Sequence, residues 1–307
     1  MRVQIKDLEL LNEELIKKNK MSLRLLEGTP YSTIALPLDY PPSRDYKPRW
    51  GYAKPVEPII DSWFKKNTYN FINLCNEMKK CAGELKQIPL IFEAKNLPEF
   101  GWIGIPYSPF DTLALYSIIR IYKPKVFLEI GSGTTTCIAH KAIKNNSTNT
   151  KIISIDPEPR AEIDSICDQV IRNGLETCDL QIFDQLEEGD ILFFDGSHRS
   201  FVNSDVTVFF IDVLPRIKPG VIIHIHDITI PWDYPDMFLP WYWNEQYLLH
   251  VYLMGNMKRI NPLLPTAFVC KDAAFETFFT TPMLGLGKYN EDWKGGGAIW
   301  FTHTTTI

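Results

Sequence analysis

The chain has 307 residues, of which 45% are hydrophobic and 22% are charged. These values are ordinary for a globular protein and predict one large domain, or one domain with an extension. The net charge of −5 gives no support for a nucleic-acid partner, and no window approaches the ~20 apolar residues of a membrane span. The six cysteines form no zinc-type spacing, so we expect reduced thiols in a cytoplasmic protein.

The first third of the chain lacks a strand–helix pattern. Leucines at helical spacing predict a helix over residues 1–27, which is either a surface helix docked on the core or a contact in a homo-oligomer. A stretch rich in Pro and Tyr follows over residues 28–58 and predicts an extended segment, and another helix is expected over 61–85. We therefore assign residues 1–104 to a helical and Pro-rich extension packed on the core, and 105–307 to the main domain.

Strands alternate with helices from residue 105 onward. Ser108-Pro-Phe-Asp111 is typical of a helix N-terminus, because Ser can cap the helix and an acid follows in its first turn. We expect that helix to reach Tyr122, further helices over 134–144, 161–173 and 201–217, and strands over 126–130, 151–155, 180–183, 190–195, 221–226, 266–269 and 298–302. This alternation predicts an α/β fold, a doubly wound, mostly parallel, Rossmann-like seven-stranded sheet with helices on both faces.

A glycine turn follows the first strand of this series, in Val126-Phe-Leu-Glu-Ile-Gly-Ser-Gly-Thr134. Glycines after a buried strand allow a sharp turn and close approach to a ligand, and the next helix offers free N–H groups. Glu129 would repel a dinucleotide pyrophosphate and suits a ligand with cationic or hydroxyl groups. Asp156 ends the next strand, where an acid accepts hydrogen bonds from ribose hydroxyls.

These residues resemble the class I S-adenosylmethionine-dependent methyltransferases. Glu129-Ile-Gly131-Ser-Gly133-Thr matches the first motif, Ile155-Asp156 the second, and Asp195 and Gly220–Asp227 later ones, so the resemblance covers about residues 105–230. It implies S-adenosylmethionine as the cofactor, bound by Glu129, Gly131, Ser132, Gly133, Asp156 and Asp195. Thr135 replaces the frequent third glycine, which also argues against an NAD site.

Acidic and histidine side chains end two neighbouring strands, in Asp195-Gly-Ser-His198 and His224-Ile-His226-Asp227. Such a cluster suits a divalent cation that lowers the pKa of a substrate hydroxyl. The segments resemble metal-assisted O-methyltransferases related to catechol O-methyltransferase, and the cephalosporin-hydroxylase-like or sugar O-methyltransferases. That resemblance implies Mg²⁺ or another divalent cation at Asp195, His226 and Asp227. Without a metal, His226 or His198 becomes the candidate general base, which makes His226, Asp227 and His198 the candidate catalytic residues.

An aromatic segment follows Asp227 and predicts a lid over residues 229–256. Its rings suit flat or sugar-like acceptors, and Trp232, Tyr234, Trp241 and Trp243 are the candidate substrate contacts. The alternative is a packed loop and helix beside the sheet. We predict O-methylation of a hydroxyl on a small-molecule or glycan-type acceptor. The alternatives are an NAD(P)-dependent oxidoreductase and a non-catalytic nucleotide-binding scaffold.

Overall fold

The computed structural model describes residues 47–91, 98–102, 105, 107–159, 162–280 and 293–305. The helix predicted over residues 1–27, and most of the Pro-rich segment after it, lie outside the described residues. Residues 48–307 form one compact unit. Within it, the long helix α3 (Pro58–Met78) packs against strand β6 and helix α5, so residues before 105 contribute to the same core.

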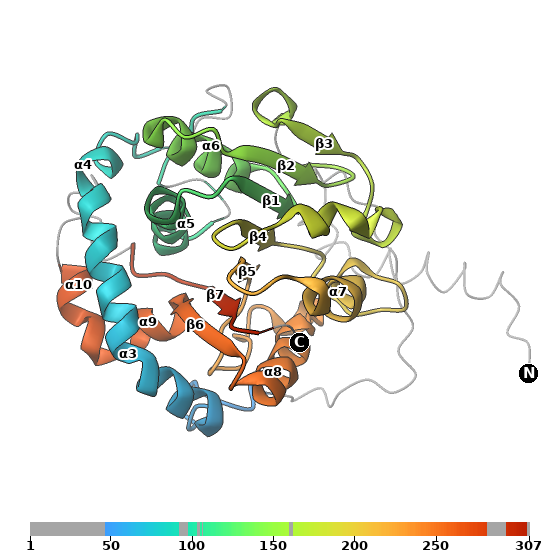
Figure 1. The fold of residues 1–307 in the computed structure, drawn as a ribbon. Coiled ribbons are helices and arrows are strands. Elements are labelled where there is room, and N and C mark those ends of the chain that lie inside the picture. Colours follow the sequence, from blue (N-terminus) through green and yellow to red (C-terminus); the bar gives the residue numbers. More distant parts are fainter. Residues whose placement is uncertain are drawn as a thin grey trace, which may run out of the picture. The chain divides into compact units, whose positions relative to one another are not determined.

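A seven-stranded sheet lies at the centre of this unit (Figure 1). Its strands are β1 (Val126–Ile130), β2 (Lys151–Ile155), β3 (Gln169–Ile171), β4 (Ile191–Phe194), β5 (Ile222–His226), β6 (Ile260–Pro265) and β7 (Ala298–His303), in the order β3-β2-β1-β4-β5-β7-β6. The first five are parallel, and β7 runs antiparallel to both β5 and β6. The chain leaves β1 toward β2 on one side and returns to β4 on the other, which makes the gap between β1 and β4 the switch point where such sheets bind ligands. The predicted fold class is confirmed.

Helices cover the sheet on both sides (Figure 1). In addition to α3 they are α4 (Ala82–Leu85), α5 (Pro109–Tyr122), α6 (Thr134–Asn146), α7 (Asp205–Val208), α8 (Glu245–Asn256), α9 (Thr266–Lys271) and α10 (Glu276–Thr280). Helices α5 and α6 pack against each other, and α7 and α8 lie on the opposite side of the sheet from them. No helix in the described part of the chain is both long and apolar enough to cross a membrane.

Local sequence signals explain the elements nearest the switch point. The predicted cap of α5 is present, since the Ser108 hydroxyl accepts a hydrogen bond of 3.1 Å from the Asp111 amide. The helix ends with Lys123 in the left-handed conformation, and Pro124 prevents its continuation. Strands β4 and β5 are buried along their whole length, as expected for apolar runs inside a parallel sheet.

Two predictions about the segment between β2 and β4 are wrong. A helix is expected over 161–173 because Ile163, Ile166 and Val170 have helical spacing. The structure instead has the strand β3 within this range, and β3 pairs with the edge of β2. Asp168 supplies part of that pairing, with its amide donating to the Ile152 carbonyl at 2.9 Å and its carboxylate accepting from the Ile152 amide at 2.8 Å. The strand expected over 180–183 is a 3₁₀ helix, Leu180–Gln185, capped by Asp179.

Two more predictions fail where proline changes the backbone. The single helix expected over 201–217 consists of α7, a π-helical stretch (Phe209–Val213) and a 3₁₀ turn (Leu214–Arg216) that contains Pro215. The strand expected over 266–269 is helix α9, and the strand lies just before it as β6. The prolines of β6 are tolerated because β6 is an edge strand, where a missing N–H breaks no ladder.

Candidate active site

The turn after β1 lies against the end of β4. Gly131 has φ of +77°, a conformation that favours glycine, and a side-chain carbon built on it would lie 1.8 Å from the carbonyl oxygen of Asp195. Its amide donates to the Ile155 carbonyl at 3.0 Å, and the Asp195 amide donates to the Ile130 carbonyl at 2.9 Å. The predicted cofactor turn is therefore next to Asp195, which the sequence predicted as a cofactor-binding and metal-binding residue.

Glu129 lies beneath this turn and is fully buried. Its two carboxylate oxygens accept hydrogen bonds from the hydroxyls of Thr135 and Thr136, in the first turn of α6. Burial raises the pKa of Glu129 to about 8 from its ordinary 4.5, although the two hydroxyls act in the opposite direction. The side chain thus fixes the start of α6 to β1, and its direct contact with a cofactor stays a prediction.

Asp156 follows β2 and ties the turn to that strand. One carboxylate oxygen accepts from the Ser132 amide at 2.7 Å, and the other accepts from the Glu158 amide at 2.7 Å. The Ser132 hydroxyl also pairs with that of Ser154 at 2.8 Å. Asp156 is only partly buried, so its oxygens can accept further hydrogen bonds from a ligand. Its predicted role toward ribose is compatible with this position but is not tested by it.

Three side chains converge where β4 and β5 end. His198 Nε2 lies 3.5 Å from Asp195 Oδ1 and 3.4 Å from Asp227 Oδ2, and one ligand atom of each residue lies within 4.8 Å of the other two. The histidine is buried, whereas 23% and 24% of the aspartate side chains are exposed, which leaves one side of the cluster open. His198 and Asp227 both have positive φ, of 62° and 51°, a strained conformation that is concentrated at functional sites.

A buried acid holds the other side of the His198 ring. Glu245, the first residue of α8, is hydrogen-bonded to His198 Nδ1, and the Trp243 ring packs on the imidazole with a centroid distance of 4.1 Å. Burial alone would lower the pKa of His198, but the carboxylates of Glu245, Asp195 and Asp227 raise it to about 9. A ring with that pKa is protonated at neutral pH unless a metal ion displaces the proton.

His226 occupies a different position from the one predicted. Its Nε2 lies 3.7 Å from Asp227 Oδ1, but the group of three that could hold an ion contains His198 in its place. Tyr107 packs over the His226 ring at 4.4 Å, and the ring is almost completely buried. The ligand set predicted from the sequence therefore differs by one residue from this candidate group, and both sets stay predictions.

Comparison with known proteins identifies the part of the chain that carries this site. A family model described as "Methyltransferase domain" matches residues 128–228, which begin in β1 and end just after Asp227. Residues 128–228 are thus similar to a methyltransferase domain. The recognition of a class I S-adenosylmethionine-dependent methyltransferase is confirmed by this match together with the strand order.

One solved methyltransferase structure also aligns with this chain, but its similarity is low. The SAH-bound methyltransferase PaMTH1 of Podospora anserina aligns over 83% of this chain and 99% of its own, with 15% identity and a TM-score of 0.39. The comparison with curated proteins gave no match. The fold assignment therefore depends on the order and direction of the strands.

Part of the aromatic segment after Asp227 is packed in the protein interior, and part lies near the open side of the cluster formed by Asp195, His198 and Asp227. Trp232 packs beside Gly51 and under the Lys271 ammonium, and Tyr234 is buried with its hydroxyl accepting from the Gln246 amide at 3.2 Å. Trp241 is 44% exposed and packs on Trp243 at 4.8 Å, so these two rings lead from solvent to His198. As substrate contacts, Trp241 and Trp243 are better placed than Trp232 and Tyr234, and all four assignments remain predictions.

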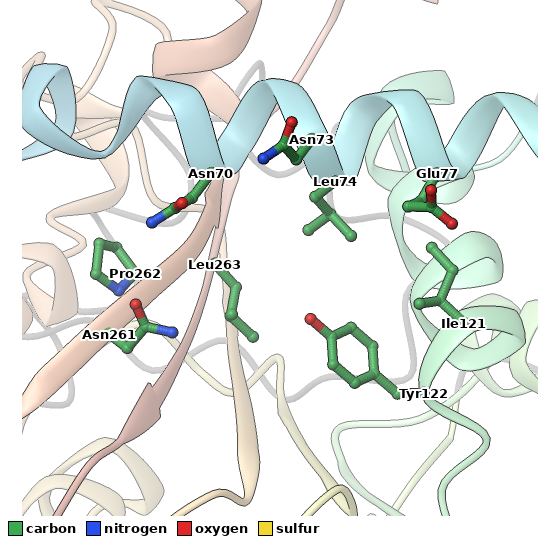
Figure 2. A pocket seen from close by; sticks show the side chains of 9 residues that line it. All are labelled: Asn70, Asn73, Leu74, Glu77, Ile121, Tyr122, Asn261, Pro262 and Leu263. Carbon is green, nitrogen blue, oxygen red and sulfur yellow. The ribbon is translucent and has the colours of Figure 1, made fainter.

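A surface cavity of about 320 Å³ lies elsewhere, between α3, the end of α5 and β6 (Figure 2). Asn261 in its wall pairs through β7 with the beginning of β5, at the edge of the sheet opposite the carboxyl ends. The lining residues are Asn70, Asn73, Leu74, Glu77, Ile121, Tyr122, Asn261, Pro262 and Leu263. None belongs to the predicted site, so the cavity is separate from it.

Sequence reasoning missed Glu245 as a site residue. The acid stands at the start of a helix after an aromatic run, a position where acids commonly stabilise the helix N-terminus. The one available signal was its place in the segment that leaves the strand end at Asp227. Sequence reasoning also missed Tyr107, which lies just before the Ser108 cap and packs over the His226 ring.

Proposed function

We propose that the domain transfers a methyl group from S-adenosylmethionine to a hydroxyl oxygen of a small-molecule or glycan-type acceptor, with a divalent cation held by Asp195, His198 and Asp227. The observation that carries the proposal is the contact between Gly131 and the backbone of Asp195. It puts the cofactor turn beside the group that can prepare an acceptor hydroxyl.

The carboxyl ends of β1 and β2 supply what a cofactor of this kind needs. S-adenosylmethionine, when bound, supplies an electrophilic methyl group on a sulfonium. Gly131 lets the turn pack directly against the backbone of Asp195, and the half-buried Asp156 offers carboxylate oxygens to hydroxyl groups. Glu129 keeps the turn in place from below through the two threonine hydroxyls. These residues bind and orient, which is the main requirement for a direct transfer.

The cluster at the ends of β4 and β5 fits a divalent cation by its chemistry. Asp195, Asp227 and Glu245 surround one imidazole, so negative groups outnumber the positive charge that His198 can carry. Two carboxylates and one imidazole form a donor set suited to a first-row divalent ion. Such an ion would lower the pKa of an acceptor hydroxyl. The exposed sides of the two aspartates face the space that the acceptor would enter.

Trp241 and Trp243 support an acceptor with a flat or sugar-like face. Their rings form a row of tilted contacts that ends at the His198 imidazole, with centroid distances of 4.8 Å and 4.1 Å. An acceptor ring lying against this row would bring its hydroxyl to the cluster, because His198 is itself the last ring of the row. We assign His226 to the support of Asp227, which it contacts at 3.7 Å.

Calorimetry separates the cofactor classes. We expect S-adenosylmethionine to bind the wild type, and Gly131→Ala to abolish this binding because the new methyl group collides with the backbone of Asp195. Gly83→Ala is the matched control, since a side-chain carbon there meets no atom within 4 Å. Binding of NADH without any response to S-adenosylmethionine would contradict the proposal.

Transfer itself is measured with a methyl-labelled cofactor and a panel of phenols, sugars and amines. We expect label in hydroxyl acceptors, lost on chelation and restored by a divalent ion. Labelling of amines alone would exclude O-methylation. Hydroxyl labelling that is unaffected by chelators in both wild type and Asp227→Ala would exclude a catalytic cation.

A further inference from the structure

The structure assigns a role to Glu245, which touches neither the cofactor turn nor the open face of the cluster. We propose that Glu245 is a positioning residue that fixes the His198 imidazole with Nε2 toward Asp195 and Asp227, and that it thereby sets which metal ions the site prefers. The inference rests on the cation site of the proposed function and extends it to a residue outside the donor set.

The contact between the two side chains is enclosed by protein. Glu245 is 1% exposed, and one of its carboxylate oxygens is hydrogen-bonded to His198 Nδ1. Its second oxygen is buried without a hydrogen-bond partner among the described residues. A buried carboxylate costs folding free energy unless it is paired, and the side-chain partner that the structure gives Glu245 is the His198 imidazole. Such an arrangement is hard to explain as packing alone.

The two residues before Glu245 hold the same histidine. Trp243 packs on the ring, and the Asn244 amide donates to the His198 carbonyl at 2.9 Å. The Asn244 side-chain oxygen accepts from the Ser200 amide at 2.7 Å. Residues 243–245 therefore hold the His198 ring, the His198 backbone and the loop that follows. His198 has a φ of 62°, a strained conformation that these contacts stabilise.

A defined tautomer follows from this geometry. When a metal ion takes the Nε2 position, the imidazole keeps a single N–H donor, at Nδ1, and that donor faces Glu245. The lone pair of Nε2 then faces Asp195 and Asp227, as in metal sites where a carboxylate orients the ligating histidine. Imidazole nitrogen favours Co²⁺ or Zn²⁺ over Mg²⁺, whereas carboxylates alone suit Mg²⁺ and Ca²⁺. Losing the orientation should consequently weaken Co²⁺ binding more than Mg²⁺ binding.

The test compares the affinities of the cofactor-free protein for Co²⁺ and Mg²⁺. We expect Glu245→Ala to weaken Co²⁺ binding by about 10- to 100-fold, followed by its visible absorption, with a smaller change for Mg²⁺ by calorimetry. Glu245→Gln keeps the side-chain size and an acceptor oxygen, so its loss should be smaller. His198→Asn should reduce the Co²⁺ preference at least as much as Glu245→Ala.

Asp233→Asn is the matched control for damage to the segment. Asp233 is also buried, and it accepts from the Arg49 amide at 2.6 Å, the Tyr234 amide at 2.9 Å and the Tyr247 hydroxyl at 2.6 Å. The Asp233→Asn variant should therefore keep the wild-type preference for Co²⁺ over Mg²⁺. If the Co²⁺ affinity is unchanged in both Glu245 variants, or if both ions lose affinity equally, the positioning role of Glu245 is overturned. The proposed cation site itself is not overturned by these two results. A wild type that binds neither ion overturns the cation site itself, while its response to S-adenosylmethionine still reports on the cofactor.

Discussion

The buried carboxyl of Glu129 should make the stability of the protein fall as the pH rises. Its pKa is raised to about 8 in the folded protein by burial, against an ordinary value of 4.5 that serves for the unfolded chain. Between these values the folded protein holds a proton that the unfolded chain has released, so each rise in pH favours unfolding. From pH 6 to pH 8 the loss is about 2 kcal/mol, because the slope of ~1.4 kcal/mol per pH unit flattens near pH 8.

Glu129→Gln removes this titration and keeps a side chain of the same shape against Thr135 and Thr136. We expect the difference in unfolding free energy between variant and wild type to change by about 2 kcal/mol in favour of the variant from pH 6 to pH 8. Urea unfolding at several pH values measures it. The control is Glu77→Gln, the same chemical change at an exposed position of α3. Parallel pH profiles for wild type and Glu129→Gln would refute the reasoning.

Three further predictions concern the same sheet. Thr135→Val removes a hydroxyl that lowers the pKa of Glu129, so the pH-dependent loss of stability should extend to higher pH in urea titrations. Asp190→Ala leaves the amides of residues 125, 126 and 187 without their acceptor, at 2.9, 2.8 and 2.9 Å, and should cost about 3–5 kcal/mol of unfolding free energy while S-adenosylmethionine affinity measured on the folded protein stays unchanged. Burial holds the pKa of His224 well below its ordinary 6.5, so the unfolded chain takes up a proton first as the pH falls, and His224→Phe should lose less stability than wild type between pH 6.5 and 5.

The elements that sequence predicted well carry their signal locally. Strands β1, β2, β4 and β5 are short apolar runs with turn residues at their ends, and Ser108 marks the start of α5 by its own side chain. The glycine turn is equally local, because Gly131 must adopt a positive φ wherever the chain makes this bend. Such signals do not depend on knowing which other segment lies nearby.

The predictions that failed depend on partners distant in the sequence. Strand β3 forms because β2 has a free edge, and β6 forms on β7 despite its two prolines. The choice between His198 and His226 had the same difficulty, since each stands near an aspartate at a strand end. His198 Nε2 lies near both Asp195 and Asp227, and its ring is held there by Glu245, 47 residues further along the chain, so no local pattern shows this arrangement.

The two acids that flank β4 show how position separates structural from chemical use. In Asp190-Ile-Leu-Phe-Phe-Asp195 the first acid lies at the amino end of the strand, buried and satisfied by three backbone amides. The second lies at the carboxyl end, half-buried, facing His198 with an open side. A fully satisfied carboxylate has little capacity left for a ligand, whereas Asp195 is held in place by its backbone bond to β1 and keeps its oxygens available. The same residue type therefore stabilises one edge of the sheet and leaves the other edge able to bind an ion.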